Sequence, residues 1–255
     1  MNRVPRPAAA ALAAGVLWLT TACGEDRSDP KYGSPAEPTA AEPTGADDRA
    51  VTEAQARAAL ITDEDLPGQW SPADDGGTPA GRMLRGKAGA AACHDLISGL
   101  RDNDVVGPGS GATADRTFRG GDSTLSYQVA AYQEEAAVQG LERIKRLPAK
   151  CDDFTLTDAH GHRATAQVTG VSLPDTGDDS AGVRMVLDTE VEGLAATLTL
   201  EVAAVRVGPN VLTVVNGGLD GADEEATRTA VDTGTDRLRE VMDGGTPRST
   251  PGEFD

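Results

Sequence analysis

The sequence predicts an α+β fold, a single domain in which amphipathic helices pack against an antiparallel sheet. Apolar residues recur at helical spacing in the first part of the domain, whereas alternating or continuous apolar runs fill the C-terminal half. Glycine, aspartate, asparagine and proline separate those runs at short intervals, as they do between strands joined by tight turns. The sheet is therefore expected to come mainly from the C-terminal half.

The first part of the domain is predicted to be mostly helical. The expected elements are a helix opened by the capping box Thr52-Glu53-Ala54-Gln55, a helix over 88–100, a strand over 124–131 and a helix over 134–147. The last of these helices should bury a stripe of Val138, Leu141 and Ile144 and should end at Pro148. Residues 103–113 are rich in glycine and are expected to be irregular.

The C-terminal half is predicted to form strands and one closing helix. The expected strands are 154–158, 163–173, 183–191, 194–207 and 211–215. Hairpin turns are expected at Glu192-Gly193 and Gly208-Pro209-Asn210. A final helix over 223–242, followed by Gly244 as its C-terminal cap, would complete the domain.

Residues 1–22 have the layout of a signal peptide. Two arginines precede an apolar run over residues 8–19, and small residues at 20–22 lead into Cys23. A run of about 12 apolar residues is too short to span a bilayer, which needs about 20. We therefore expect residues 1–22 to direct export and to be removed.

Cys23 is the predicted site of lipid attachment. The stretch from Leu19 to Cys23 resembles the lipobox of bacterial lipoproteins, in which the cysteine receives a diacylglyceryl thioether and becomes the mature N-terminus. Leu19 lies one place further from the cysteine than that motif prefers, and Thr20 takes its position. The resemblance implies anchoring at the outer face of the cell membrane. The alternative is an ordinary secreted protein, cleaved nearby, with a free cysteine.

Two segments have the composition of disordered chain. Residues 23–50 are rich in Pro, Glu, Asp, Thr and Ala, and cannot bury enough apolar surface to offset their ordering entropy. Treated as a flexible coil, residues 24–50 have a root-mean-square reach on the order of 30 Å. We expect a lipidated tether over 23–50, a folded domain over 51–244 and a disordered tail over 245–255.

The charge balance argues against nucleic acid as a partner. The 255 residues include 41 Asp and Glu against 23 Lys and Arg, a formal net charge of −18. Phosphate backbones are bound by clustered Lys and Arg, which this chain lacks. We interpret the acidic excess as a contribution to solubility.

One glycine-rich stretch has the spacing of a nucleotide-binding loop. Gly81 to Lys87 fits that spacing, but Ala88 stands where a Mg²⁺-binding hydroxyl is needed, and no strand precedes the stretch. A solvated loop is the expected structure. The chain contains no Gly-x-Ser-x-Gly elbow for a serine nucleophile.

Histidines and paired acids are the remaining candidates for chemistry. Asp158, His160 and His162 would share one face of a strand and, with His94, suggest metal ligands, but a turn is expected at His160-Gly161. The acidic pairs are Asp74-Asp75, Asp152-Asp153 and Asp178-Asp179. They would serve glycoside hydrolysis only across a cleft. The run from Asp220 to Glu225 lacks calcium-loop spacing and suits a helix start. We expect no catalytic residue, metal or cofactor.

Cys93 and Cys151 are the two cysteines left in the domain. In an exported protein, two such cysteines are expected to form a disulfide. The alternative is a pair of buried, reduced thiols.

Several segments resemble the extracellular sensor domain of mycobacterial PknH-type kinases, a family that also occurs as free-standing lipoproteins. The residues that carry the resemblance are Leu60-Ile61-Thr62, Asp65-Leu66, Val129–Tyr132, Glu135-Ala136, Leu147–Cys151, Val205-Arg206 and Asn210–Leu212. The resemblance covers about residues 52–243 and implies an α+β sensor-like domain with a cleft and without known enzymatic activity. A second disulfide of that family has no counterpart, because Ala203–Arg206 contains no cysteine.

These observations favour a membrane-anchored lipoprotein whose domain binds an envelope ligand or protein partner without catalysing a reaction. Two other classes stay open: a hydrolase acting on cell-wall material through carboxylates that the sequence does not place, and an inert envelope scaffold.

Overall fold

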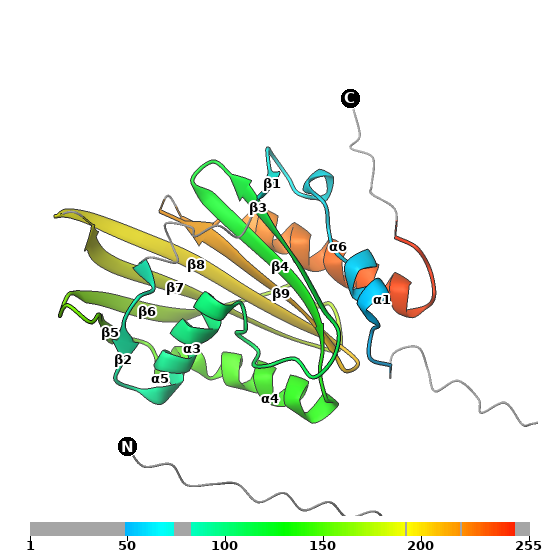
Figure 1. Ribbon diagram of the computed structural model, residues 1–255, viewed down its shortest axis with the longest axis horizontal. Coiled ribbons are helices and arrows are strands. Elements are labelled where there is room, and N and C mark those ends of the chain that lie inside the picture. The colour runs from blue at the N-terminus through cyan, green and yellow to red at the C-terminus, as the bar shows by residue number, and fades with distance from the viewer. Residues whose placement is uncertain (1–48, 74–82, 192, 220, 248–255) are drawn as a thin grey trace, which may run out of the picture. The chain divides into compact units, whose positions relative to one another are not determined.

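The computed structural model describes residues 49–73, 83–191, 193–219 and 221–247 (Figure 1). The expected signal peptide, Cys23 and nearly all of the tether lie outside the described residues, as does the tail from residue 248 onward. No helix among the described residues is both long enough and apolar enough to cross a membrane.

The described residues form one antiparallel sheet of nine strands, which confirms the α+β prediction. The strand order is β1-β3-β4-β9-β8-β7-β6-β5-β2. The strands are β1 Ser71–Ala73, β2 Lys87–Ala88, β3 Thr113–Gly120, β4 Ser123–Ala131, β5 Phe154–Thr157, β6 Arg163–Val171, β7 Asp179–Val191, β8 Leu194–Val207 and β9 Asn210–Gly218. The five strands from β5 to β9 match the predicted C-terminal strands, and β4 matches the strand predicted at 124–131. The strands β1, β2 and β3 were not predicted.

Helices cover both faces of this sheet (Figure 1). They are α1 Glu53–Ala58, the short 3₁₀ helix η2 Asp63–Asp65, α3 Ala91–Asp102, α4 Glu134–Lys145, α5 Leu147–Lys150 and α6 Glu224–Met242. One core cluster joins α1 and α6 to β3, β4, β8 and β9, and the other joins α3, α4 and α5 to the opposite face. The central strand β8 is therefore buried on both faces, which explains its continuous apolar run from Val202 to Val205.

The capping box expected at α1 is present, and α6 also begins with a side-chain cap. The Thr52 hydroxyl accepts a hydrogen bond from the Gln55 backbone N–H, and the Gln55 side chain accepts one from the Thr52 backbone. At the start of α6, the Asp223 carboxylate accepts from the Ala226 N–H. Each contact satisfies a backbone donor that the first turn of a helix leaves without a partner.

The apolar stripe predicted for α4 is confirmed at Leu141 and Ile144 and was wrong at Val138. Val138 is 39% exposed, and the buried residues of α4 are Ala137, Gly140, Leu141 and Ile144. A Cβ atom at Gly140 would lie 2.6 Å from the Val106 carbonyl oxygen, so the helix turns its smallest residue toward that loop. This close approach rotates the buried face away from Val138.

Pro148 does not end the helix as predicted. The helix α4 ends at Lys145, and Pro148 lies in the first turn of α5. A proline is tolerated in a first turn because no intrahelical partner is available there for the N–H that it lacks. The start predicted for the preceding helix was also early, since Lys87 and Ala88 form β2 and α3 begins at Ala91.

A buried ion pair joins η2 to α6. The Arg237 Nη2 atom lies 2.9 and 2.7 Å from the two carboxylate oxygens of Asp65, and Arg237 Nη1 donates to the Leu60 carbonyl. Asp65 also accepts from the backbone N–H and the hydroxyl of Thr62. These partners satisfy charges that would be costly to bury alone.

Cys93 and Cys151 form a disulfide, with their Cα atoms 5.6 Å apart. Both cysteines are fully buried. The bond ties the first turn of α3 to the end of α5, and the Cys151 carbonyl accepts a hydrogen bond from the Val168 N–H of β6. The position of α3, and of β2 that leads into it, is thereby tied to the sheet.

Candidate functional site

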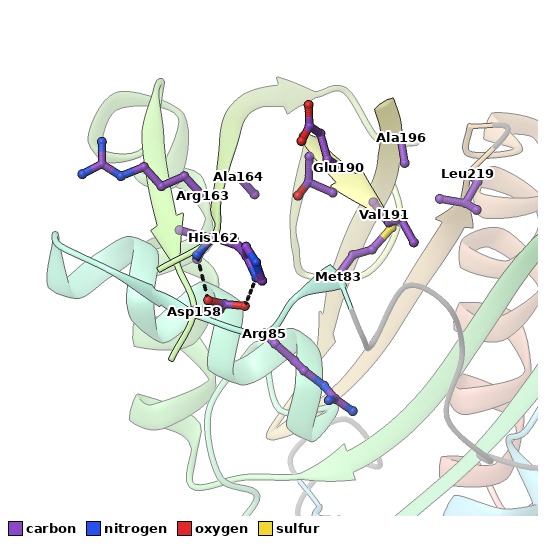
Figure 2. A pocket seen from close by; sticks show the side chains of 12 residues that line it. Met83, Arg85, Asp158, His162, Arg163, Ala164, Glu190, Val191, Ala196 and Leu219 are labelled. Atoms are coloured by element: carbon purple, nitrogen blue, oxygen red, sulfur yellow. Dashed lines mark hydrogen bonds and ion pairs between the residues drawn. The ribbon is translucent and has the colours of Figure 1, made fainter. Parts of the chain in front are cut away.

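A pocket of about 500 Å³ lies at the end of the sheet where β7 and β8 approach their hairpin. We call it the hairpin-end pocket. The strands β5 to β8 contribute to its lining, together with the segment before β2 and the residue that follows β9 (Figure 2). Its apolar lining consists of Met83, Leu156, Ala164, Val191, Ala196 and Leu219.

Small side chains explain why the pocket is hollow. Along one face of β8 the residues are Ala196, Leu198 and Leu200, and the two leucines are buried in the core. Leu187 lies directly across from Leu198 on the neighbouring strand, whereas Thr189 lies across from Ala196. The row that fills the core with large side chains thus continues toward the hairpin with small ones, and the space stays open.

The turn between β5 and β6 forms one wall. The Asp158 carboxylate accepts hydrogen bonds from the backbone N–H groups of His160 and His162, at 2.8 and 2.9 Å. The His162 Nδ1 atom lies 2.9 Å from the other carboxylate oxygen. Gly161 has φ 86°, a left-handed conformation that this tight turn requires. The sequence predicts a turn at His160-Gly161. In the structure this turn holds the His162 side chain against the Asp158 carboxylate in the pocket wall.

The contacts of this turn keep the Asp158 carboxylate charged. Desolvation opposes its ionisation, but the hydrogen bonds from His162 and from the two backbone N–H groups outweigh it. The pKa of Asp158 is therefore lower than that of an ordinary aspartate.

Charged side chains surround the apolar centre. Arg85, Arg163 and Glu190 all line the pocket and are exposed. Figure 2 shows them on three different sides of Met83 and Val191, with the Arg163 side chain directed away from the centre. None of the three forms an ion pair or side-chain hydrogen bond within the described part of the chain. The mouth of the pocket thus presents charges that have no protein partner there.

Exposed apolar side chains gather beside the pocket. Among the described residues, four large apolar side chains are exposed, and three of them lie at this end of the sheet. They are Val191 at 44%, Leu194 at 74% and Leu219 at 45% exposure. Val191 and Leu194 face each other across the two strands, next to the turn. An apolar surface outside the core is a common feature of binding sites.

The other sequence candidates do not converge on this pocket. Gly81 and Asp74-Asp75 lie outside the described residues, as does Asp220. Asp178 pairs with Arg206, and Asp179 with Lys145, so these acids support the structure around them. The described residues contain no group of three or more His, Cys, Asp or Glu arranged to hold a metal ion.

Sequence reasoning singled out Asp158 and His162 but missed the other residues of the site. Met83, Arg85 and Glu190 come from three segments that only the strand pairing brings together. A signal for the hollow was the pair of small residues Ala195-Ala196, which stands at the start of a strand whose later apolar residues are larger.

The fold resembles that of the extracellular domain of PknH from Mycobacterium tuberculosis, as seen in its crystal structure. The TM-score is 0.50 and the sequence identity 15%, over 75% of this chain and 98% of that domain. No protein-family model and no curated protein matches the sequence. At this identity the likeness concerns the fold alone, and in that respect it agrees with the resemblance found in the sequence. The chain shares the fold of that extracellular domain.

Proposed function

We propose that the domain is a non-enzymatic, extracytoplasmic binding module that takes the apolar part of a small ligand into the hairpin-end pocket. The pocket carries the proposal, because its centre is apolar and its mouth holds charges without a partner among the residues that the structure describes. Its volume lies within the range of about 300–1,000 Å³ that is usual for ligand sites. The likeness to an extracellular domain supports a location outside the cytoplasm.

The same proposal places the chain on the membrane through a lipid at Cys23. The tether would enter the domain at Val51, whose N–H donates to Asn210 at the turn between β8 and β9. The pocket lies at the other end of β8, which has 14 residues and is therefore about 45 Å long. This arrangement supports a pocket far from the point of attachment. Replacing Cys23 by serine should move the protein from the membrane fraction to the soluble fraction, and unchanged partition would contradict the anchor.

Methionine methyl groups offer a direct test of the pocket. The chain has four methionines. Met83 lines the pocket, whereas Met185 is buried in the core and Met242 lies at the end of α6. We would label the methionine methyl groups with ¹³C in the full chain carrying Cys23→Ser. Dodecanoate, dodecyl maltoside and dodecyltrimethylammonium would then be added below their micelle concentrations.

At least one probe should shift the Met83 signal in a saturable way and leave that of Met242 unchanged. Ala196→Phe should abolish the shift because the ring fills the pocket. Ala195→Phe is the matched control, since Ala195 is exposed on the opposite face of β8 and lines no part of the pocket. A Met83 signal that responds to none of the probes would refute the proposed function.

One observation favours a hydrolase as the second candidate. Asp158 and Glu190 both line the pocket, so two carboxylates face one cavity. Asp158 is held ionised by its hydrogen bonds, which leaves Glu190 as the group that would have to donate a proton. A hydrolase would release sugars or peptides from peptidoglycan and would lose that activity on Glu190→Gln. A binding module would release neither, and the variant would still bind the probes.

A further inference from the structure

We infer that the ligand of the hairpin-end pocket is an anionic amphiphile, a molecule whose apolar chain or ring carries a phosphate or carboxylate. This inference rests on the proposed function and names the class of ligand. It depends on which charges at the mouth of the pocket are still available to a ligand.

Of the two carboxylates that line the pocket one is engaged, whereas neither of the two lining arginines forms an ion pair within the described residues. Asp158 accepts three hydrogen bonds from its own turn. Arg85 and Arg163 have no ion pair within the described residues, and Glu190 is the one lining carboxylate without a partner there. Because the guanidinium group binds carboxylate and phosphate through two parallel hydrogen bonds, two free arginines favour an anionic group.

The two arginines lie at one corner of the sheet, and a further cation nearby, Lys87, does not line the pocket. Lys87 of β2 lies directly across from Thr157, and Thr157 lies directly across from Arg163. Residues in register point to the same face, so Lys87 lies on the face of the sheet opposite to Leu156 and Ala164, which line the pocket. The cations available to a ligand in the pocket are therefore Arg85 and Arg163.

This corner contrasts with the charge of the whole protein. The chain carries a net charge of −18, so an anion is repelled by the protein as a whole. Within the described residues, the pocket places two cations without an ion pair, Arg85 and Arg163, against one carboxylate without a partner, Glu190. An anionic group is therefore favoured beside the pocket.

The apolar surface next to these cations requires that the ligand also has an apolar part. Met83 and Val191 lie at the centre of the pocket, and the exposed side chains of Leu194 and Leu219 extend the apolar surface beyond it. A small inorganic anion would leave this surface in water. An amphiphile covers it and brings its charged group to the mouth.

The test compares head groups on one common chain. Dodecyl phosphate, dodecanoate, dodecyl maltoside and dodecyltrimethylammonium are titrated into the full chain carrying Cys23→Ser, with the Met83 methyl signal as the readout. The two anionic probes should bind at least tenfold more tightly than the cationic probe, and added salt should weaken them. Stronger binding of dodecyl phosphate than of dodecanoate identifies phosphate as the preferred head group, and the reverse order identifies carboxylate.

Charge variants assign the preference to this corner. Arg85→Gln combined with Arg163→Gln should weaken binding of the anionic probes about tenfold relative to binding of dodecyl maltoside. Arg239→Gln is the matched control, because Arg239 is exposed in the last turn of α6, at the far end of the sheet. Glu190→Gln should strengthen binding of the anionic probes.

The outcomes separate the two proposals. A Met83 signal that responds to none of the four probes refutes the proposed function itself. Saturable binding without preference for the anionic probes, or with preference for the cationic one, overturns the inference alone. An anionic preference that survives the double variant overturns its assignment to Arg85 and Arg163.

Discussion

Removing the disulfide should lower the stability of the domain by about 4 kcal/mol. Cys93 and Cys151 are 58 residues apart in sequence. Closing a loop of that length lowers the entropy of the unfolded chain by about 14 cal/mol/K, which corresponds to about 4 kcal/mol at 25 °C. For a domain spanning residues 51–244, a loss of this size lowers Tm by roughly 10 °C. The double variant Cys93→Ala/Cys151→Ala makes the change without leaving an unpaired thiol.

Urea denaturation, followed by far-UV circular dichroism, measures this loss. The double variant should unfold at lower urea concentration and with a larger m-value, because its unfolded chain is less compact than the cross-linked one. Chemical reduction of the unmodified protein should give the same shift, which controls for the loss of two buried sulfur atoms. A difference below about 1 kcal/mol would refute the reasoning, since it would mean that the bond hardly restricts the unfolded chain.

Three further predictions concern the interior of the domain. Asp65→Asn should destabilise the protein by about 3–5 kcal/mol in urea denaturation, because it leaves the buried Arg237 guanidinium without its carboxylate; a loss below about 1 kcal/mol would contradict this. Gly234→Ala should lower stability, since the new Cβ would lie 2.4 Å from the Tyr127 hydroxyl. Alanine is the better helix former by about 1 kcal/mol, so a stabilised variant would refute the clash. Burial, assisted by Asp104, raises the pKa of Tyr132 to about 12. The free energy of unfolding that depends on protonated Tyr132 should be fully present below about pH 10 and should decline as the pH rises to 12, which urea denaturation can measure. Phenolate absorbance reports the titration of Tyr132 itself. Titration of Tyr132 near pH 10 in the folded protein would contradict this.

The fold could be predicted where a segment carries its own periodic pattern. The strands from β6 to β9 have long apolar runs bounded by turn residues, and α6 has both a cap and a buried stripe, so their positions follow from the sequence. The strand β3 reads Thr-Ala-Asp-Arg-Thr-Phe-Arg-Gly, with too few apolar residues to reveal itself. It is a strand because β4 pairs with it along its whole length.

The phase of α4 shows a second limit. The sequence offers Val138 and Ala137 equally as members of an apolar stripe. The choice depends on how closely the helix approaches Val106, which Gly140 permits. Contacts between segments about 35 residues apart thus decide which side of a helix is buried, and no local pattern contains that information.

Less of the site than of the fold could be predicted from the sequence, because the site depends on the register in which the strands pair. Asp158 and His162 were noticed for their spacing, but their partners in the pocket come from β7, β8 and the segment before β2. A shift of one residue in the pairing of β7 with β8 would put Thr189 and Ala196 on opposite faces of the sheet. The hollow exists only in the observed register.

The position of the pocket follows from a mismatch in length between strands and helices. The strands β7 and β8 have 13 and 14 residues and extend about 45 Å, whereas α4 with 12 residues and α6 with 19 are only about 18 and 28 Å long. No single helix can cover such strands from end to end, so part of their apolar face is left without helical cover. At the hairpin end, this face carries alanine and threonine in place of leucine, and Met83 covers part of it. A ligand can therefore reach an apolar surface there without separating either core cluster. We accordingly expect the backbone of the domain to change little on binding.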